Sequence, residues 1–113
     1  MSAEISLPGV LGEIEAAAGR EAALTVALKL GGQVMHVPAP DYLLERPDHP
    51  LARALGTETA AQVAARLSGG QVYVPRARRA LAVHLAGTGL APPEIAATLG
   101  VAVQSARRYI RQS

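Results

Sequence analysis

The chain of 113 residues contains no cysteine, no phenylalanine and no tryptophan. The absence of cysteine excludes disulfides and thiolate metal sites. The absence of the two large aromatic residues means that the core must be built from alanine, leucine and valine, which bury less area per residue. Small cores of this kind often gain stability by dimerisation. We therefore expect one small domain, or two small lobes, in a chain that dimerises.

Long hydrophobic runs are also absent. The apolar stretch at residues 22–30 contains Lys29 and is far shorter than the roughly 18 residues that a membrane helix needs. Residues 1–15 carry acids on both sides of a short apolar stretch and lack the basic segment of a secretory signal. We expect a cytoplasmic protein without a membrane partner.

Residue patterns for catalysis or metal binding are scarce. His36, His49 and His84 have no carboxylate or cysteine at ligand spacing, which favours surface or core histidines. No Ser-His-Asp or paired-carboxylate arrangement has local support. The glycine pairs at Gly31 and Gly69 are not followed by the Gly-Lys-Ser/Thr of a phosphate loop. The sequence thus predicts no enzyme, no cofactor and no metal ion.

The net charge is only +2, but the charges are unevenly distributed. Residues 1–56 carry seven acids and four bases, whereas residues 57–113 carry two acids and seven bases, all of them arginine. A basic C-terminal half is typical of a chain that meets a polyanion. A solvated surface without a partner explains the same imbalance, so charge alone leaves both interpretations open.

Residues 7–30 have apolar side chains at steps of three and four, which predicts two helices with a break at Gly19. Gly31 and Gly32 are expected to end the second helix, because glycine readily takes the left-handed conformation that closes a helix. Residues 33–37 then favour a short strand.

Residues 38–50 are rich in proline, aspartate and charge, which predicts a loop whose apolar residues dock on the core. Pro50 suits a first helical turn, so a brief helix is expected over residues 51–55. A further helix is predicted from Thr57, its expected N-cap, to Leu67.

A phrase near the first strand occurs twice, as GGQVMHVP from Gly31 and as GGQVYVP from Gly69. Each copy follows an alanine-rich amphipathic helix, so the repeated unit is helix, glycine pair, strand and proline. A lone short strand leaves backbone donors and acceptors unpaired. We therefore expect the two copies to pair, either with each other or across a dimer axis.

Residues 76–86 are predicted to form a helix with three arginines at its start, Arg76, Arg78 and Arg79. Basic side chains oppose the helix dipole at this end. An external phosphate would compensate for that placement, although exposed arginines can also tolerate it.

Residues 92–110, PPEIAATLGVAVQSARRYI, have the spacing of a helix-turn-helix. Pro92 and Pro93 fit only at a helix start, and Gly100 permits the positive φ of the turn. The second helix, which starts at Ala102 without a capping side chain, would bury a stripe of three residues: Val103, Ala106 and Ile110.

The opposite face of this second helix carries side chains suited to reading DNA. In the major groove, glutamine pairs with N6 and N7 of adenine, and arginine pairs with O6 and N7 of guanine. We expect base contacts from Gln104, Ser105 and Arg108. Phosphate contacts, which position a protein without specifying sequence, are expected from Arg107, Tyr109, Arg111, Arg76, Arg78 and Arg79. The alternative is an ordinary helical hairpin whose exposed face is basic.

Together these motifs resemble the Mor/C family of phage transcription activators. The resemblance extends over residues 14–111 and is carried by His49-Pro50-Leu51, the GGQ and VYVPR segments from Gly69, and EIAATLGVAVQSARRYI. It implies a homodimer with an N-terminal helix-strand dimerisation lobe, residues 1–75, and a C-terminal helix-turn-helix, residues 76–113. It also implies a dyad site near a promoter, RNA polymerase as a further partner, and a strand region near the DNA formed by Gln71, Tyr73 and Arg76.

The sequence as a whole predicts a mainly α fold with short β-strands. The predicted function is that of a sequence-specific transcriptional regulator of phage or prophage type, which binds double-stranded DNA as a homodimer. The alternative is a protein-interaction or assembly module whose basic helix face binds an acidic partner.

Overall fold

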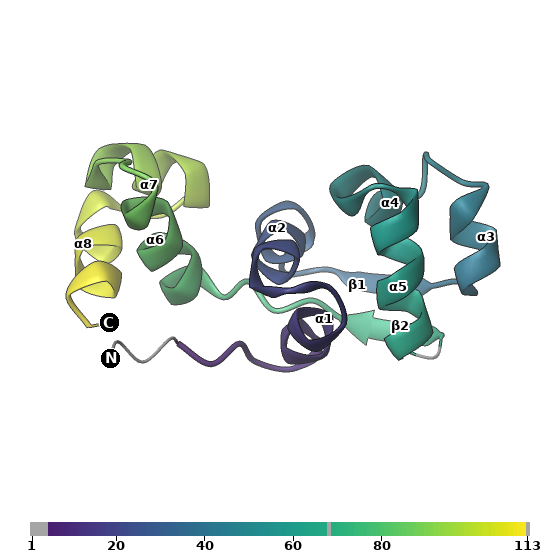
Figure 1. The fold of residues 1–113 in the computed structure, drawn as a ribbon. Helices are drawn as coiled ribbons and strands as arrows, with labels where there is room; N and C mark the ends of the chain where they lie inside the picture. The colour runs from purple at the N-terminus through teal and green to yellow at the C-terminus, as the bar shows by residue number, and fades with distance from the viewer. Residues whose placement is uncertain (1–4, 68, 113) are drawn as a thin grey trace. The chain divides into compact units, whose positions relative to one another are not determined.

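The computed structural model describes residues 5–67 and 69–112. These residues form eight helices and one two-stranded antiparallel sheet, which confirms the predicted mainly α fold with short strands (Figure 1). None of the described helices is both long and apolar enough to cross a membrane.

The described residues divide into two compact units. The strand-containing unit comprises residues 7–76, and the three-helix unit comprises residues 77–112 together with Ile5 and Ser6. The division falls one residue beyond the predicted boundary between residues 75 and 76. Residues 1–4 and 113, which the predicted domains include, lie outside the described residues.

The strand-containing unit begins with two helices, α1 (Val10–Ala18) and α2 (Arg20–Leu30). The break at Gly19 is confirmed, and this glycine has a φ of +96°, where a side chain would be strained. The predicted left-handed glycine after α2 is Gly32, with a φ of +85°, whereas Gly31 has an ordinary φ of −58°.

The loop predicted over residues 38–50 contains a short helix, α3 (Pro40–Leu44), so the prediction is wrong at these positions. Leu43 is fully buried, while Tyr42 and Leu44 stay exposed. A helix of one turn with a single inward side chain shows no apolar periodicity, which explains why the sequence pattern missed it.

Two further helices follow, α4 (Pro50–Leu55) and α5 (Thr57–Leu67), both in the predicted places. The ring nitrogen Nδ1 of His49 accepts a hydrogen bond from the backbone N–H of Leu51 at 3.1 Å and so caps α4. Thr57 is the first residue of α5, and its predicted role as the N-cap is therefore wrong.

The two copies of the repeated phrase form the sheet. Strand β1 (Val34–Val37) pairs antiparallel with β2 (Gly70–Tyr73) within the chain. Val34 lies opposite Tyr73, and Val37 lies opposite Gly70. Pairing within the chain, which was one of the two expected arrangements, satisfies the backbone groups between the strands.

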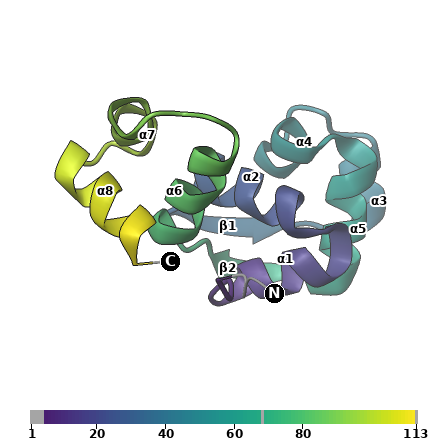
Figure 2. The same ribbon diagram turned by 60° about the vertical axis from the view of Figure 1, so that its left-hand side comes forward.

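Helix α5 packs against α1, α3 and α4, and α2 packs against α1 and α4, as can be followed in Figure 2. Aliphatic side chains fill the space between these elements, as the lack of large aromatic residues requires. The larger fully buried ones are Leu11, Ile14, Val26, Val37, Leu43, Leu51, Val63 and Val74.

The three-helix unit consists of α6 (Arg78–Gly87), α7 (Pro92–Leu99) and α8 (Val103–Arg111), and each helix packs against the other two. Helix α6 begins two residues after the predicted start, so Arg76 lies outside it and belongs to the strand-containing unit. The centre of the unit is built from Ala82, Ile95, Ala96 and Ala106. Three of these are alanines, which allow the helices to approach closely.

Candidate nucleic-acid interface

Helices α7 and α8 are joined by a tight turn at Gly100. This glycine has φ +69° and ψ +36°, so its predicted left-handed conformation is confirmed. Both Gly100 and Val101 donate a backbone hydrogen bond to the carbonyl of Ala96, which closes α7. Val101 packs against the core of the unit and helps to fix the direction of α8.

The starts of the two helices differ. Helix α7 begins with Pro92 and Pro93 as predicted, and the Glu94 carboxylate accepts a hydrogen bond from the backbone N–H of Ala91 at 3.0 Å. Helix α8 follows Ala102 without a side-chain cap, which confirms the expected weak start.

Helix α8 has one buried face and one exposed face. The predicted buried residues turn inward, with Ala106 fully buried and Val103 and Ile110 packed against the central cluster. Four polar residues at steps of three and four are exposed on the other face: Gln104, Arg107, Arg108 and Arg111. We call these four residues the α8 stripe.

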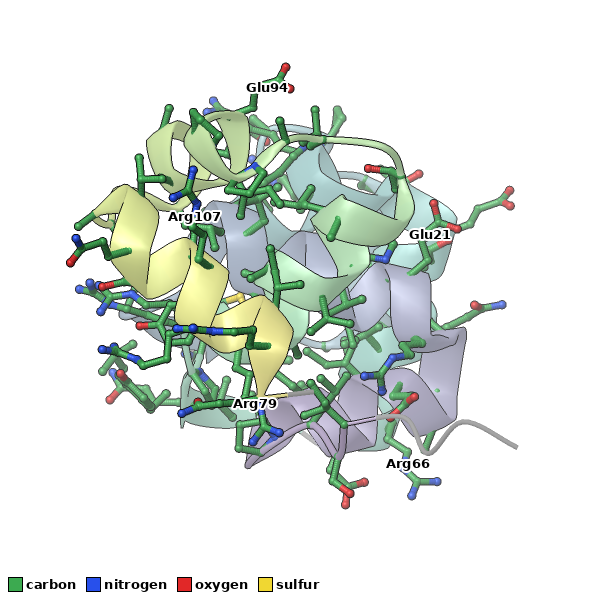
Figure 3. The ribbon with its side chains drawn as sticks, turned by 90° about the vertical axis from the view of Figure 1, so that its left-hand side faces the viewer. Glu21, Arg66, Arg79, Glu94 and Arg107 are labelled. Atoms are coloured by element: carbon green, nitrogen blue, oxygen red, sulfur yellow. The ribbon has the colours of Figure 1, made fainter. Side chains whose placement is uncertain are left out.

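The positive charge of the α8 stripe is not neutralised by the part of the chain that the structure describes. Residues 77–112 carry five arginines and one acid, Glu94. Glu94 is engaged at the start of α7 and points outward from that helix (Figure 3). Among the described residues, no carboxylate lies within ion-pair distance of the stripe arginines. Their guanidinium groups are therefore available to an external anion.

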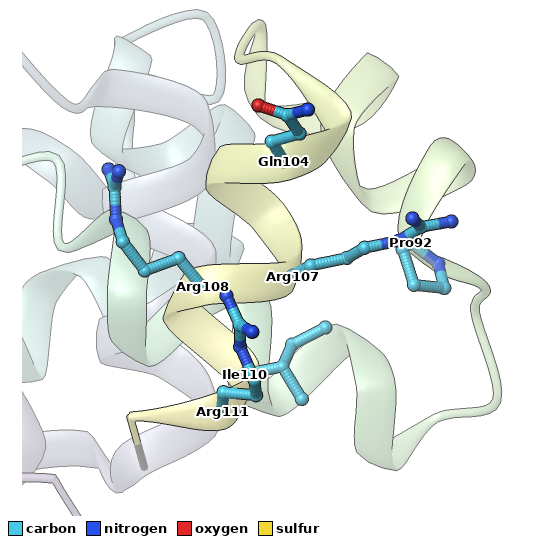
Figure 4. Close-up of a pocket in the computed structure, with 6 residues that line it drawn as sticks. All are labelled: Pro92, Gln104, Arg107, Arg108, Ile110 and Arg111. Carbon is cyan, nitrogen blue, oxygen red and sulfur yellow. The ribbon is translucent and has the colours of Figure 1, made fainter.

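A hollow of about 610 Å³ runs along the stripe (Figure 4). It is lined by the four stripe residues together with Pro92 and Ile110. These two apolar residues were predicted for helix initiation and for the buried stripe, and not for the site. Their place in the hollow depends on how α7 packs against α8, and the spacing within one helix does not encode that packing.

The structure places two further predicted contact residues beside the stripe. Ser105 is half-buried, and the half-buried Tyr109 packs against the central cluster. The Arg108 guanidinium lies 5.6 Å from the centroid of the Tyr109 ring, within the range of a cation–π interaction. Tyr109 thus supports Arg108 from the core side of the helix.

The remaining predicted phosphate-binding arginines are not part of the stripe. Arg79 on α6 donates a hydrogen bond to the carbonyl of Gln112, where a cation also suits the C-terminal end of the α8 dipole. Arg78 is half-buried at the first position of α6. In the other unit, the Arg76 guanidinium lies against Gly32, at the turn that follows α2.

The strand residues predicted to lie near DNA occupy the exposed face of the sheet. Met35 and Val37 point into the core, so the alternating residues Gln71 and Tyr73 face solvent. Tyr73 is 57% exposed, and its cross-strand neighbour Val34 is 65% exposed. These residues belong to the strand-containing unit, whereas the α8 stripe belongs to the three-helix unit.

A smaller hollow of about 210 Å³ in the strand-containing unit is lined partly by His36 and His49. One ring nitrogen of His49 is already used to cap α4. Within residues 5–67 and 69–112, no three His, Asp or Glu side chains come together to hold a metal ion.

Comparison of the chain with models of protein families, with curated proteins and with solved structures gave no match. The resemblance to the Mor/C family therefore stays a prediction.

Proposed function

We propose that this protein is a sequence-specific DNA-binding regulator of transcription, in which α7 and α8 form a helix-turn-helix and α8 enters the major groove. The observation that carries the proposal is the α8 stripe. It presents three arginines and one glutamine on the exposed face of the second of two helices joined by a tight turn. An α-helix fits the major groove, where these side chains meet base edges and phosphates.

The full proposal follows the resemblance to the Mor/C family. It includes a homodimer on a dyad site, dimerisation through the strand-containing unit, and Gln71 and Tyr73 near the DNA. The solvent-facing positions of these two side chains support that part of the proposal. RNA polymerase, as a further partner, rests on the resemblance alone.

Salt-dependent DNA binding tests the proposal. Labelled random-sequence duplex DNA is titrated with the protein at several salt concentrations. We expect the logarithm of the binding constant to fall linearly with the logarithm of salt concentration. Arg107→Ala and Arg111→Ala should each reduce the magnitude of this slope by about 1.

Arg53→Ala provides a matched control, because Arg53 is also an exposed helical arginine but lies on α4 in the other unit. It should leave the slope unchanged. Binding that does not depend on salt, or that survives the combined Arg107→Ala and Arg111→Ala substitutions unweakened, would refute the proposal.

An acidic protein partner is the second candidate, and the apolar Pro92 and Ile110 within the basic hollow favour it. Such a hollow can accept apolar and acidic side chains together. Capture of one defined partner, equally efficient before and after nuclease treatment and lost in Arg107→Ala, would favour this candidate over DNA binding.

A further inference from the structure

The α8 stripe divides into two edges. Arg107 extends toward Pro92 of α7, whereas Arg108 extends in the opposite direction (Figure 4). Gln104 and Arg108 are four residues apart, so they lie on the same side of the helix and about 6 Å apart along its axis. The stripe therefore has a Gln104–Arg108 edge and an Arg107–Arg111 edge.

The Arg107–Arg111 edge has the chemistry for a sugar-phosphate strand. It adjoins the apolar Pro92 and Ile110 side chains in the hollow. A deoxyribose can pack on these apolar groups while its phosphate accepts hydrogen bonds from a guanidinium. Contacts of this kind position the helix and do not depend on base identity.

The Gln104–Arg108 edge has the chemistry for base edges. The glutamine amide matches N7 and N6 of adenine, and the guanidinium matches N7 and O6 of guanine. Successive base pairs are about 3.4 Å apart along the duplex axis, so a separation of about 6 Å corresponds to no more than two steps.

We propose that α8 reads an adenine through Gln104 and a guanine through Arg108, with the two base pairs within two steps of each other in each half-site. This inference rests on the proposed DNA-binding function and adds the sequence that the site prefers. It makes Gln104 and Arg108 the specificity-determining residues and Arg107 and Arg111 the positioning residues. Ser105, the third residue expected to contact bases, is half-buried and does not line the hollow, so it has no part in this inference.

The test is selection of bound duplexes from a random pool, carried out with the full chain and with two exchange variants. The wild type should enrich an adenine and a guanine within two steps. Gln104→Arg should change the adenine to guanine at one position, and Arg108→Gln should change the guanine to adenine at the other. The distance between the two altered positions measures the spacing directly.

Two controls separate specificity from charge. Arg108→Lys keeps the charge but loses the two-pronged hydrogen bonding, so discrimination at the guanine should fall about tenfold while the salt slope is kept. Arg107→Ala should select the same half-site as the wild type and bind all duplexes more weakly. Circular dichroism of each variant verifies that these exposed substitutions leave the fold intact.

The outcomes for this inference and for the proposed function are distinct. Salt-dependent binding together with unchanged base preferences in both exchange variants would overturn the inference and leave DNA binding in place. Altered positions more than two steps apart would also overturn it. A folded wild-type chain that binds no duplex at any salt concentration would refute the proposed function and the inference with it.

Discussion

Ala77 has a left-handed backbone, with φ +48° and ψ +44°, at the N-cap of α6. Among the described residues it is the one position other than glycine with a positive φ. This conformation costs an L-residue about 1–2 kcal/mol. Glycine would remove that cost, but it would also make the unfolded chain more flexible, which offsets part of the gain in stability. We therefore expect Ala77→Gly to raise the free energy of unfolding by about 0.5–1 kcal/mol, measured by urea denaturation.

Ala97→Gly is the matched control for this prediction. Ala97 is exposed within α7, where its backbone is an ordinary right-handed helix. The same substitution there should lower the free energy of unfolding by about 1 kcal/mol. Equal losses of stability in both variants would show that the left-handed backbone at Ala77 carries no cost.

His49 stabilises α4 through its ring nitrogen, which accepts the Leu51 N–H at 3.1 Å. Removal of an N-cap acceptor costs about 1 kcal/mol. His49→Ala should therefore lower the free energy of unfolding by about this amount in urea titrations at neutral pH. His49→Asn, which restores an acceptor, should recover most of the loss. If the asparagine variant were as unstable as the alanine variant, the loss of stability would come from lost packing of the histidine ring and not from the lost hydrogen bond.

At the scale of the elements, Gly31 marks a close approach between the end of α2 and the segment that follows β2. A Cβ at this position would clash with the Ala27 carbonyl and lie 3.0 Å from the Arg76 Cα. Because its φ is −58°, alanine would suffer crowding but no backbone strain. Gly31→Ala should lower the free energy of unfolding by about 1–3 kcal/mol in urea denaturation.

Gly87 supplies the comparison, since it ends α6 and a Cβ there would meet nothing within 4 Å apart from its chain neighbours and the nearby backbone of its own helix. Gly87→Ala should raise the free energy of unfolding by about 0.5 kcal/mol, because it restricts the unfolded chain without a clash. If the Gly31→Ala variant were as stable as the Gly87→Ala variant, the close contact at Gly31 would cost nothing. The segment after β2 would then move aside freely, and the prediction would be wrong.

The elements differ in how far the sequence predicts them. Helices with two or more turns, such as α2 and α5, have a repeated apolar face and were predicted almost to the residue. The repeated phrase predicts that the two strands pair, but the choice between pairing within the chain and pairing across a dimer axis came only from the structure. Helix α3 was missed because it has one buried side chain. The cap by His49 was missed because histidine is not among the usual capping residues.

The sequence predicts part of the candidate site. The exposed face of α8 follows from helical spacing, so the sequence identified all four stripe residues. The contribution of Pro92 and Ile110 depends on the packing of two helices, which no local pattern specifies. The partner of Arg79 at the Gln112 carbonyl likewise connects residues far apart in the chain.

At the scale of the whole molecule, the division into two units shows where the excess positive charge lies. Residues 7–76 carry seven acids and six bases, whereas residues 77–112 carry one acid and five bases. The excess positive charge therefore belongs to the three-helix unit and not to the C-terminal half in general. The proposed function assigns DNA binding to the three-helix unit and dimerisation to the strand-containing unit. The charge distribution fits this assignment, because DNA is a polyanion.

The small core and the exposed apolar pair on the sheet lead to a prediction about oligomeric state. The core contains mainly alanine and aliphatic side chains, while Val34 and Tyr73 remain exposed opposite each other. We expect sedimentation equilibrium at micromolar concentration to give about twice the chain mass of 11.7 kDa. Since association stabilises the folded state by mass action, the melting temperature should also rise with protein concentration.

A closed dimer with two-fold symmetry predicts that two copies bind one palindromic duplex and that a duplex with one half-site binds far more weakly. Titration of both duplexes at matched salt concentration measures the difference. A chain that sediments at 11.7 kDa, melts at a temperature independent of concentration and binds both duplexes equally would contradict the dimer. Salt-dependent binding to the single half-site would still leave the α8 stripe as the DNA-binding surface, because that surface lies within one chain.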